Sequence, residues 1–141
     1  MILVLDASVV AKWFFEELDS DKARDILVRC GEGQIRLLAP EILPAEIANS
    51  LSKRVLRGVL GEEAALAQYA RFERLCPSLV SISRLADLAL RMALANRHSV
   101  YDCLYVALAT ETRCDLLTAD ERLYNTFSIA IPAVKLLHDW A

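Results

Sequence analysis

Apolar residues occur along this chain in short runs that are separated by longer mixed stretches. The run Ile2–Leu5 contains no polar position, which is typical of a strand buried on both faces in a parallel sheet. Polar residues, glycine or proline bound the other runs in the same way. Five strands are therefore predicted, at residues 2–5, 35–39, 79–82, 115–118 and 134–136.

The mixed stretches are predicted to be helices, because capping residues, glycine and proline stand where helices usually begin and end. Ser83 and Ser99 are the predicted N-caps of two helices, and Gly31 and Gly58 are placed just beyond the ends of two others. About seven helices result: one from about residue 7, one ending near 57 after Pro40 and Pro44, and others at 19–30, 61–75, 83–96, 101–112 and 120–127.

Strands and helices alternate along most of the chain, which is the order expected of an α/β protein. We therefore expect three α/β/α layers around a mainly parallel central sheet of short strands. The chain has 141 residues, a length that fits one domain and buries enough surface to fold without disulfides. Residues 1–141 are expected to form a single domain.

The chain is unusually apolar for a protein in water. Hydrophobic residues make up 55% of it, and its mean hydropathy is +0.32. Such a composition suggests elements buried on more than one face and a homodimer interface. No apolar run reaches the roughly 18 residues of a membrane span, and Asp6 interrupts the first run before a signal-peptide core forms. A cytoplasmic location without membrane contact is expected.

Cysteine spacing and net charge limit the kinds of metal site and of nucleic-acid binding that the chain can have. Cys30, Cys76, Cys103 and Cys114 form no C-x-x-C pair, and their spacing from the two histidines, His98 and His138, matches no zinc module. Reduced, mostly buried thiols are expected. A net charge of −3 argues against strong non-specific binding to nucleic acid, although it leaves room for a local grip on RNA.

Four acidic residues fall where a helix begins or where a strand gives way to a helix. Asp6 and Asp120 each follow a predicted strand, Glu46 lies in the first turns of the third helix, and Asp102 begins an apolar helix. Side chains beyond the carboxyl ends of parallel strands collect in one crevice. Because hard divalent cations prefer oxygen ligands, these acids predict a site for Mg²⁺ or Mn²⁺.

Each acid also has a simpler explanation when it is taken alone. Asp6 stands where a helix N-cap would be, Asp120 repeats this strand-to-helix position, and Glu46 would be stable on a face turned to solvent. Asp102 could cap the first turn of a helix that is apolar nearly all round, although Ser99 already offers a capping oxygen there. The hydroxyls of Ser8 and Thr118 either hold carboxylates in place or only satisfy backbone groups.

The motifs Leu-Asp-Ala-Ser around Asp6, Tyr-Asp-Cys-Leu-Tyr-Val-Ala-Leu-Ala around Asp102 and Leu-Leu-Thr-Ala-Asp-Glu-Arg-Leu around Asp120, with a helical Glu46 between the first two, resemble the PIN-domain family. Within that family they are similar to VapC-type toxins, and the resemblance extends from Asp6 to the last predicted strand. It implies a metal-dependent endoribonuclease that hydrolyses RNA phosphodiester bonds. It also implies the toxin component of a type II toxin–antitoxin pair, whose partner is a small antitoxin protein.

The resemblance also implies roles for particular residues. Asp6, Glu46, Asp102 and Asp120 match the four acids of the family, which serve as catalytic and metal-binding residues for one or two Mg²⁺ or Mn²⁺ ions. Ser8 and Thr118 match its supporting hydroxyls. The aromatic cluster Trp13, Phe14 and Phe15 is expected to combine a core role with antitoxin contact.

RNA contacts are expected on the helix that carries Glu46. Basic residues on helices usually belong to a solvated face, and that explanation is open for each of them. Together they suggest a rim that contacts phosphates, with Arg71 and Arg74 on the next helix behind it. The candidates are Asn49, Lys53, Arg54 and Arg57.

Two other functions fit parts of the pattern. A phospho-receiver module also has an Asp at a strand end, a Thr on a later strand and a Lys such as Lys135 near the last. Receivers, however, have adjacent acids after the first strand and place the acceptor Asp after a central strand. A non-catalytic PIN-like scaffold that binds RNA or protein is the second alternative, and the intact set of four acids weighs against it.

Overall fold

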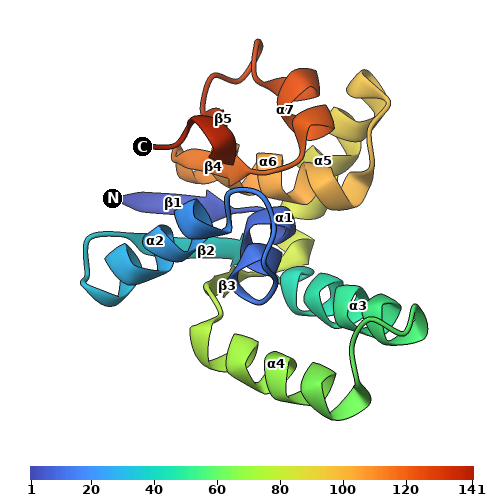
Figure 1. Cartoon of the computed structure of the whole chain (residues 1–141). Coiled ribbons are helices and arrows are strands. Elements are labelled where there is room, and N and C mark those ends of the chain that lie inside the picture. Colours follow the sequence, from blue (N-terminus) through green and yellow to red (C-terminus); the bar gives the residue numbers. More distant parts are fainter.

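The parallel sheet predicted from the short apolar runs is present in the computed structural model, which describes all residues 1–141 (Figure 1). Every neighbouring pair of strands is parallel, and the strand order is β3-β2-β1-β4-β5. The first, fourth and fifth strands have the predicted bounds, the second starts and ends one residue later, and the third starts one residue earlier and ends two residues earlier than predicted. The strands are β1 (Ile2–Leu5), β2 (Arg36–Pro40), β3 (Ser78–Val80), β4 (Asp115–Thr118) and β5 (Val134–Leu136).

Seven α-helices connect the strands, as the sequence predicts. Two short 3-10 turns, Ala11–Trp13 after the first helix and Leu137–Asp139 near the end of the chain, are additional. The helices are α1 (Ala7–Val10), α2 (Ser20–Gly31), α3 (Leu43–Leu56), α4 (Glu62–Leu75), α5 (Ile82–Asn96), α6 (Val100–Thr112) and α7 (Glu121–Phe127).

Two predicted helix boundaries are wrong. Helix α5 starts at Ile82 with Ser81 in the N-cap position, so Ser83 lies inside its first turn rather than at its cap. This earlier start also shortens β3. Helix α2 continues through Gly31, because the chain leaves the helix at Gly33, whose φ of +77° is a left-handed conformation that favours glycine.

The sheet lies between two layers of helices. Helices α5, α6 and α7 lie on one side of it and α2, α3 and α4 on the other (Figure 1). Helix α6 packs against β1, β2 and β4, and α5 packs against α6. The predicted three-layer α/β/α fold is therefore confirmed.

One hydrophobic core of 31 buried residues fills the space between these layers. The strands contribute fully buried side chains, and α6 is buried continuously over Cys103–Ala109, as its uniform apolar character predicts. Trp13 is buried and its Nε1 donates a hydrogen bond to the Ala23 carbonyl oxygen at 3.0 Å, which confirms its core role. No helix is long and apolar enough to cross a membrane.

The register of the two central strands positions the candidate site. Leu5 on β1 pairs with Leu117 on β4, so both strands end at the same level. The Asp6 backbone N–H donates to the Leu117 carbonyl oxygen at 3.0 Å and extends this pairing by one residue. Asp6 and Thr118, which lie far apart in sequence, are thereby neighbours at the carboxyl edge of the sheet.

Candidate functional site

Asp6 is the most buried of the four acids, with 5% of its surface exposed. Its Oδ2 accepts hydrogen bonds from Ser8 Oγ at 2.6 Å and from Thr118 Oγ1 at 2.8 Å. Although Asp6 occupies the N-cap position of α1, its side chain accepts no capping hydrogen bond. The simple helix-cap explanation is therefore wrong for Asp6.

Ser8 and Thr118 perform both of the tasks that the sequence left open. Each hydroxyl donates to the Asp6 carboxylate and also accepts a backbone N–H, from Ala119 to Ser8 Oγ and from Asp120 to Thr118 Oγ1, both at 3.0 Å. Their rotation is consequently fixed from two sides. The Asp6 carboxylate is held in one orientation by groups that are themselves oriented.

Glu46 lies in the first turn of α3 and is half-buried. Its Oε1 accepts a hydrogen bond from the hydroxyl of Tyr105, a fully buried residue of α6, at 2.7 Å. Burial raises the pKa of Glu46 to about 7, and the nearby charges of Asp6 and Asp102 act in the same direction. Glu46 is thus bonded to a buried residue and lies near the charges of Asp6 and Asp102, and the solvated-face explanation is wrong.

Asp102 lies in the first turn of α6 but does not cap it. Ser99 has that task, as predicted, because its Oγ accepts a hydrogen bond from the Tyr101 backbone N–H at 3.2 Å. The Oδ2 of Asp102 lies 2.9 Å from Nε2 of His98. His98 is not among the site residues predicted from the sequence, although its position four residues before Asp102 is a usable signal.

Asp120 fulfils the cap explanation with one of its two oxygens. Its Oδ1 accepts from the backbone N–H groups of Arg122 at 2.9 Å and Leu123 at 3.3 Å, at the N-terminus of α7. Its Oδ2 accepts no hydrogen bond within the chain. The carboxylate is therefore a helix cap that still has a free oxygen.

All four acids use their two carboxylate oxygens differently. One oxygen of each carboxylate is held by a partner within the chain, and the other accepts no hydrogen bond there. Oxygen donors without internal partners are the ligands that Mg²⁺ and Mn²⁺ prefer. The free oxygens are Asp6 Oδ1, Glu46 Oε2, Asp102 Oδ1 and Asp120 Oδ2.

The four acids lie around one place but do not form a closed cage. Burial raises the pKa of Asp6, and the charges of Asp102 and Asp120 raise it further, so these carboxylates interact electrostatically. No three His, Cys, Asp or Glu side chains are grouped closely enough to hold one metal ion. The partners described above hold the outer acids in place around Asp6. The donor chemistry fits a hard divalent cation.

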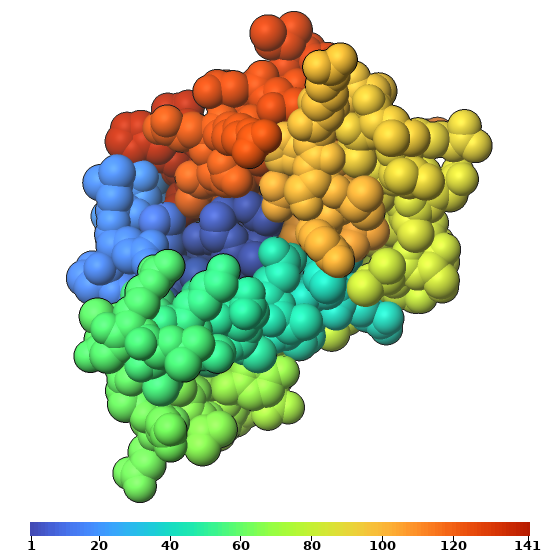
Figure 2. Space-filling model, turned by 90° about the vertical axis from the view of Figure 1, so that its right-hand side faces the viewer, coloured from blue at the N-terminus to red at the C-terminus, as the bar shows by residue number.

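The surface view shows the segments that meet at this place. In Figure 2 the N-terminal segment (dark blue) is surrounded by the first half of α3 (teal), the start of α6 (orange) and the chain around α7 (red-orange). A hollow of about 300 Å³ opens beside Glu46 and is lined by Ser8, Asn49 and Lys53, among others. Two of the predicted RNA-contact residues, Asn49 and Lys53, therefore lie beside Glu46.

The other two predicted RNA contacts differ from each other. The Arg54 guanidinium is partly exposed but has partners within the chain, because it pairs with Glu17 at 2.8 Å and lies 3.5 Å from the centre of the Phe15 ring. Arg57 is exposed and follows the end of α3. A phosphate would compete with Glu17 for the Arg54 guanidinium, whereas Arg57 is open to solvent.

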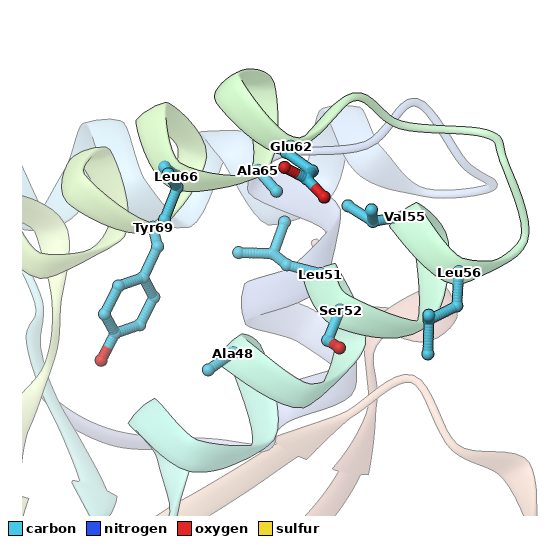
Figure 3. A pocket seen from close by; sticks show the side chains of 9 residues that line it. All are labelled: Ala48, Leu51, Ser52, Val55, Leu56, Glu62, Ala65, Leu66 and Tyr69. Atoms are coloured by element: carbon cyan, nitrogen blue, oxygen red, sulfur yellow. The ribbon is translucent and has the colours of Figure 1, made fainter.

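A second hollow lies between α3 and α4, away from the acids (Figure 3). Its volume is about 390 Å³, and its lining includes Leu51, Val55, Leu66 and Tyr69, with Glu62 as the only charged residue. Because it lacks a group of titratable or metal-binding side chains, this groove does not contribute chemistry to the candidate site.

The raised pKa of Glu46 predicts how the stability of the metal-free protein depends on pH. The unfolded chain loses the Glu46 proton near the ordinary glutamate pKa of 4.5 and the folded chain near a pKa of about 7, so the unfolded state binds fewer protons between these values. Stability should therefore fall as the pH rises through this window. The urea midpoint in EDTA, measured at about pH 5 and about pH 8, should fall less in Glu46→Gln, which keeps an acceptor for Tyr105. An equal fall in both proteins would contradict the assignment.

With this fold and site in view, comparison with known proteins gives the family. The PIN domain family model matches residues 3–127, and the chain belongs to the PIN-domain family. Membership of this family excludes the receiver-like alternative.

Two curated relatives are similar to the chain in sequence. Ribonuclease VapC3 of Pyrobaculum aerophilum is 33% identical over 129 residues, which cover 90% of this chain and 95% of the relative. Ribonuclease VapC1 of Mycobacterium tuberculosis is 39% identical over 88 residues, which cover 60% of this chain and 63% of the relative.

Two solved structures share the fold. The crystal structure of PAE2754 from Pyrobaculum aerophilum has a TM-score of 0.71 at 18% identity, and the match covers 98% of this chain and 93% of that one. VapBC2 from Rickettsia felis, bound to a DNA fragment from its promoter, has a TM-score of 0.66 at 17% identity, with 96% and 97% covered. Both confirm the PIN-like architecture over nearly the whole chain.

Proposed function

We propose that this protein is a metal-dependent endoribonuclease that hydrolyses RNA phosphodiester bonds and is the toxin of a type II toxin–antitoxin pair. The observation that carries the proposal is the arrangement at the carboxyl edge of the sheet, where four acids each keep one oxygen held and one free. The relatives that match most of the chain or a large part of it are VapC ribonucleases, which supports the same chemistry.

In this proposal Asp6, Glu46, Asp102 and Asp120 hold one or two Mg²⁺ or Mn²⁺ ions. A bound ion supplies an activated water and offsets the charge that develops on the attacking and leaving oxygens of the phosphodiester. The chain itself orients the ligands: Ser8 and Thr118 hold Asp6. The Tyr105 hydroxyl, which holds Glu46, fixes the α3 ligand against α6.

The substrate grip is proposed in the hollow beside Glu46. Lys53 and Asn49 line this hollow, where an ammonium and an amide are suited to contact phosphate and sugar oxygens. Arg57 extends the basic edge beyond the end of α3. Arg54 contributes less in this proposal, because its pairing with Glu17 competes with phosphate.

The partners in this proposal are a small antitoxin protein and a second copy of the chain. Exposed apolar side chains on the α3–α4 hairpin support a protein partner: Leu56, Val59 and Leu66 are 83%, 69% and 73% exposed. The apolar groove of Figure 3 lies on the same hairpin. In this proposal residues 1–141 form a single PIN-like domain, and the protein acts in the cytoplasm.

The test is RNA cleavage by the purified, partner-free protein. Single-stranded and hairpin RNAs incubated with Mn²⁺ or Mg²⁺ should be cut, excess EDTA should reduce the product to background, and added metal should restore it. Cleavage that persists in a metal-free preparation would contradict the metal mechanism. Measurable Mn²⁺ binding without cleavage of any RNA would favour the non-catalytic PIN-like module instead.

A further inference from the structure

The side chain of His98 is buried beside the candidate site by the geometry of the turn between α5 and α6. Arg97 takes a left-handed conformation with φ 50° at the end of α5, and the His98 backbone N–H donates to the Ala93 carbonyl oxygen at 3.1 Å. Ser99 then caps α6. The turn thus directs the His98 ring toward the first turn of α6, where Asp102 lies.

The ring is held on two sides. Its edge packs against Phe127 of α7, with ring centroids 5.6 Å apart and planes at 70°. Its Nε2 lies 2.9 Å from Asp102 Oδ2, and only 3% of the His98 side chain is exposed, against 31% for Asp102. Water therefore competes little for this hydrogen bond, unlike for an ordinary exposed pair on a helix surface.

The direction of the hydrogen bond follows from the chemistry of its partners. An ionised carboxylate only accepts, so Nε2 must carry the hydrogen, as it does in both the imidazolium and one neutral tautomer. The bond occupies Oδ2 of Asp102 and leaves Oδ1 without a partner in the chain. Ser8 and Thr118 act on Asp6 in the same way, since both bind its Oδ2.

We propose that His98 is a positioning residue for Asp102, which it orients as a metal ligand through the Nε2–Oδ2 hydrogen bond. This inference rests on the proposed function. Hydrogen-bond partners of metal-binding side chains commonly change metal affinity by about 10-fold to 100-fold when they are removed. Metal affinity is therefore the quantity that distinguishes a positioning residue from a structural one. Loss of a merely structural residue would lower stability without changing how tightly the folded protein binds the ion.

The test measures Mn²⁺ affinity of the full chain by calorimetry, without RNA. His98→Phe keeps a ring against Phe127 but has no N–H, and His98→Leu is a second variant without a donor. Both should weaken Mn²⁺ binding at least about 10-fold, whereas His98→Gln, whose amide N–H can replace Nε2–H, should stay within about 3-fold of the parent. In an Asp102→Asn background, His98→Phe should have little further effect.

The outcomes separate the two proposals. Mn²⁺ binding that is lost in Asp6→Asn but unchanged in folded His98→Phe or His98→Leu would overturn the role of His98 alone. Absence of Mn²⁺ binding by the parent would overturn both proposals. Failure of both donor-less variants to fold, judged by circular dichroism, would overturn the positioning role in favour of a structural one.

Discussion

Asp6→Asn should abolish RNA cleavage while leaving the protein folded. Asp6 is the buried centre of the four acids, and the substitution removes the charge that would bind the ion without changing the size of the side chain. We expect the cleavage rate in Mn²⁺ to fall by at least about 10²-fold, the scale found when one preorganised electrostatic group is removed from an active site. The rate of product formation from a labelled RNA at saturating Mn²⁺ is the measurement.

The stability of the same variant separates chemistry from folding. Burial raises the pKa of Asp6, so a charged carboxylate is disfavoured in the metal-free fold, and a neutral amide removes that cost. The asparagine oxygen can still accept from Ser8 and Thr118. The thermal midpoint in EDTA should therefore not fall, and Glu121→Gln, an exposed acid next to Asp120, should cleave RNA at the parental rate. Full activity of Asp6→Asn would remove Asp6 from the site.

The largest effect on stability is expected for Phe72→Ala. Phe72 is 1% exposed and is the only fully buried residue of α4. Its ring stacks on Tyr69 with centroids 5.6 Å apart and meets Phe14 edge-on at 6.3 Å. Truncation of a buried Phe to Ala costs about 3–5 kcal/mol, a large share of the roughly 5–15 kcal/mol that stabilises a typical domain. Urea unfolding followed by circular dichroism measures the loss.

Leu66→Ala on the same helix is the matched control. Leu66 is 73% exposed, so its truncation should change the free energy of unfolding by less than about 0.5 kcal/mol. If Phe72 attaches α4 to the rest of the protein, amide hydrogen exchange in α4 should accelerate in Phe72→Ala and not in Leu66→Ala. Equal losses in the two variants would show that α4 is not held by this aromatic contact.

The strands and the positions of the acids at element boundaries could be predicted, because both depend on residues that are close together in the sequence. The run Ile2–Leu5 lacks polar positions, and the acid that follows it ends the strand wherever the strand lies in the sheet. Ser99 caps α6 for the same reason, since a cap needs only residues close by in sequence. Where two serines competed, at the start of α5, Ser81 took the position expected of Ser83, because helix ends are set by small energy differences.

The sequence offered Ser8 and Thr118 as partners of the acids, but the partner of Glu46 could not be predicted, because it comes from a remote segment. Tyr105 donates to Glu46 across 59 residues of sequence, and the sequence shows Tyr105 only as one more apolar position in a buried helix. The engagement of Arg54 by Glu17 is equally invisible, since it depends on the path of a loop. The partner of Asp102 differs in this respect, because the spacing of His98 from Asp102 is local.

The placement of β1 in the middle of the sheet has a consequence for how the protein comes into being. This first strand pairs with β2 on one side and with β4 on the other, and β4 begins at Asp115. Until β4 has been synthesised, a growing chain would carry Asp6 without the Thr118 hydroxyl and with one edge of β1 open. A pairing between such distant segments forms late and slowly. The candidate centre therefore cannot be completed on a ribosome until most of the chain has emerged, and premature termination before β4 would yield an inert fragment.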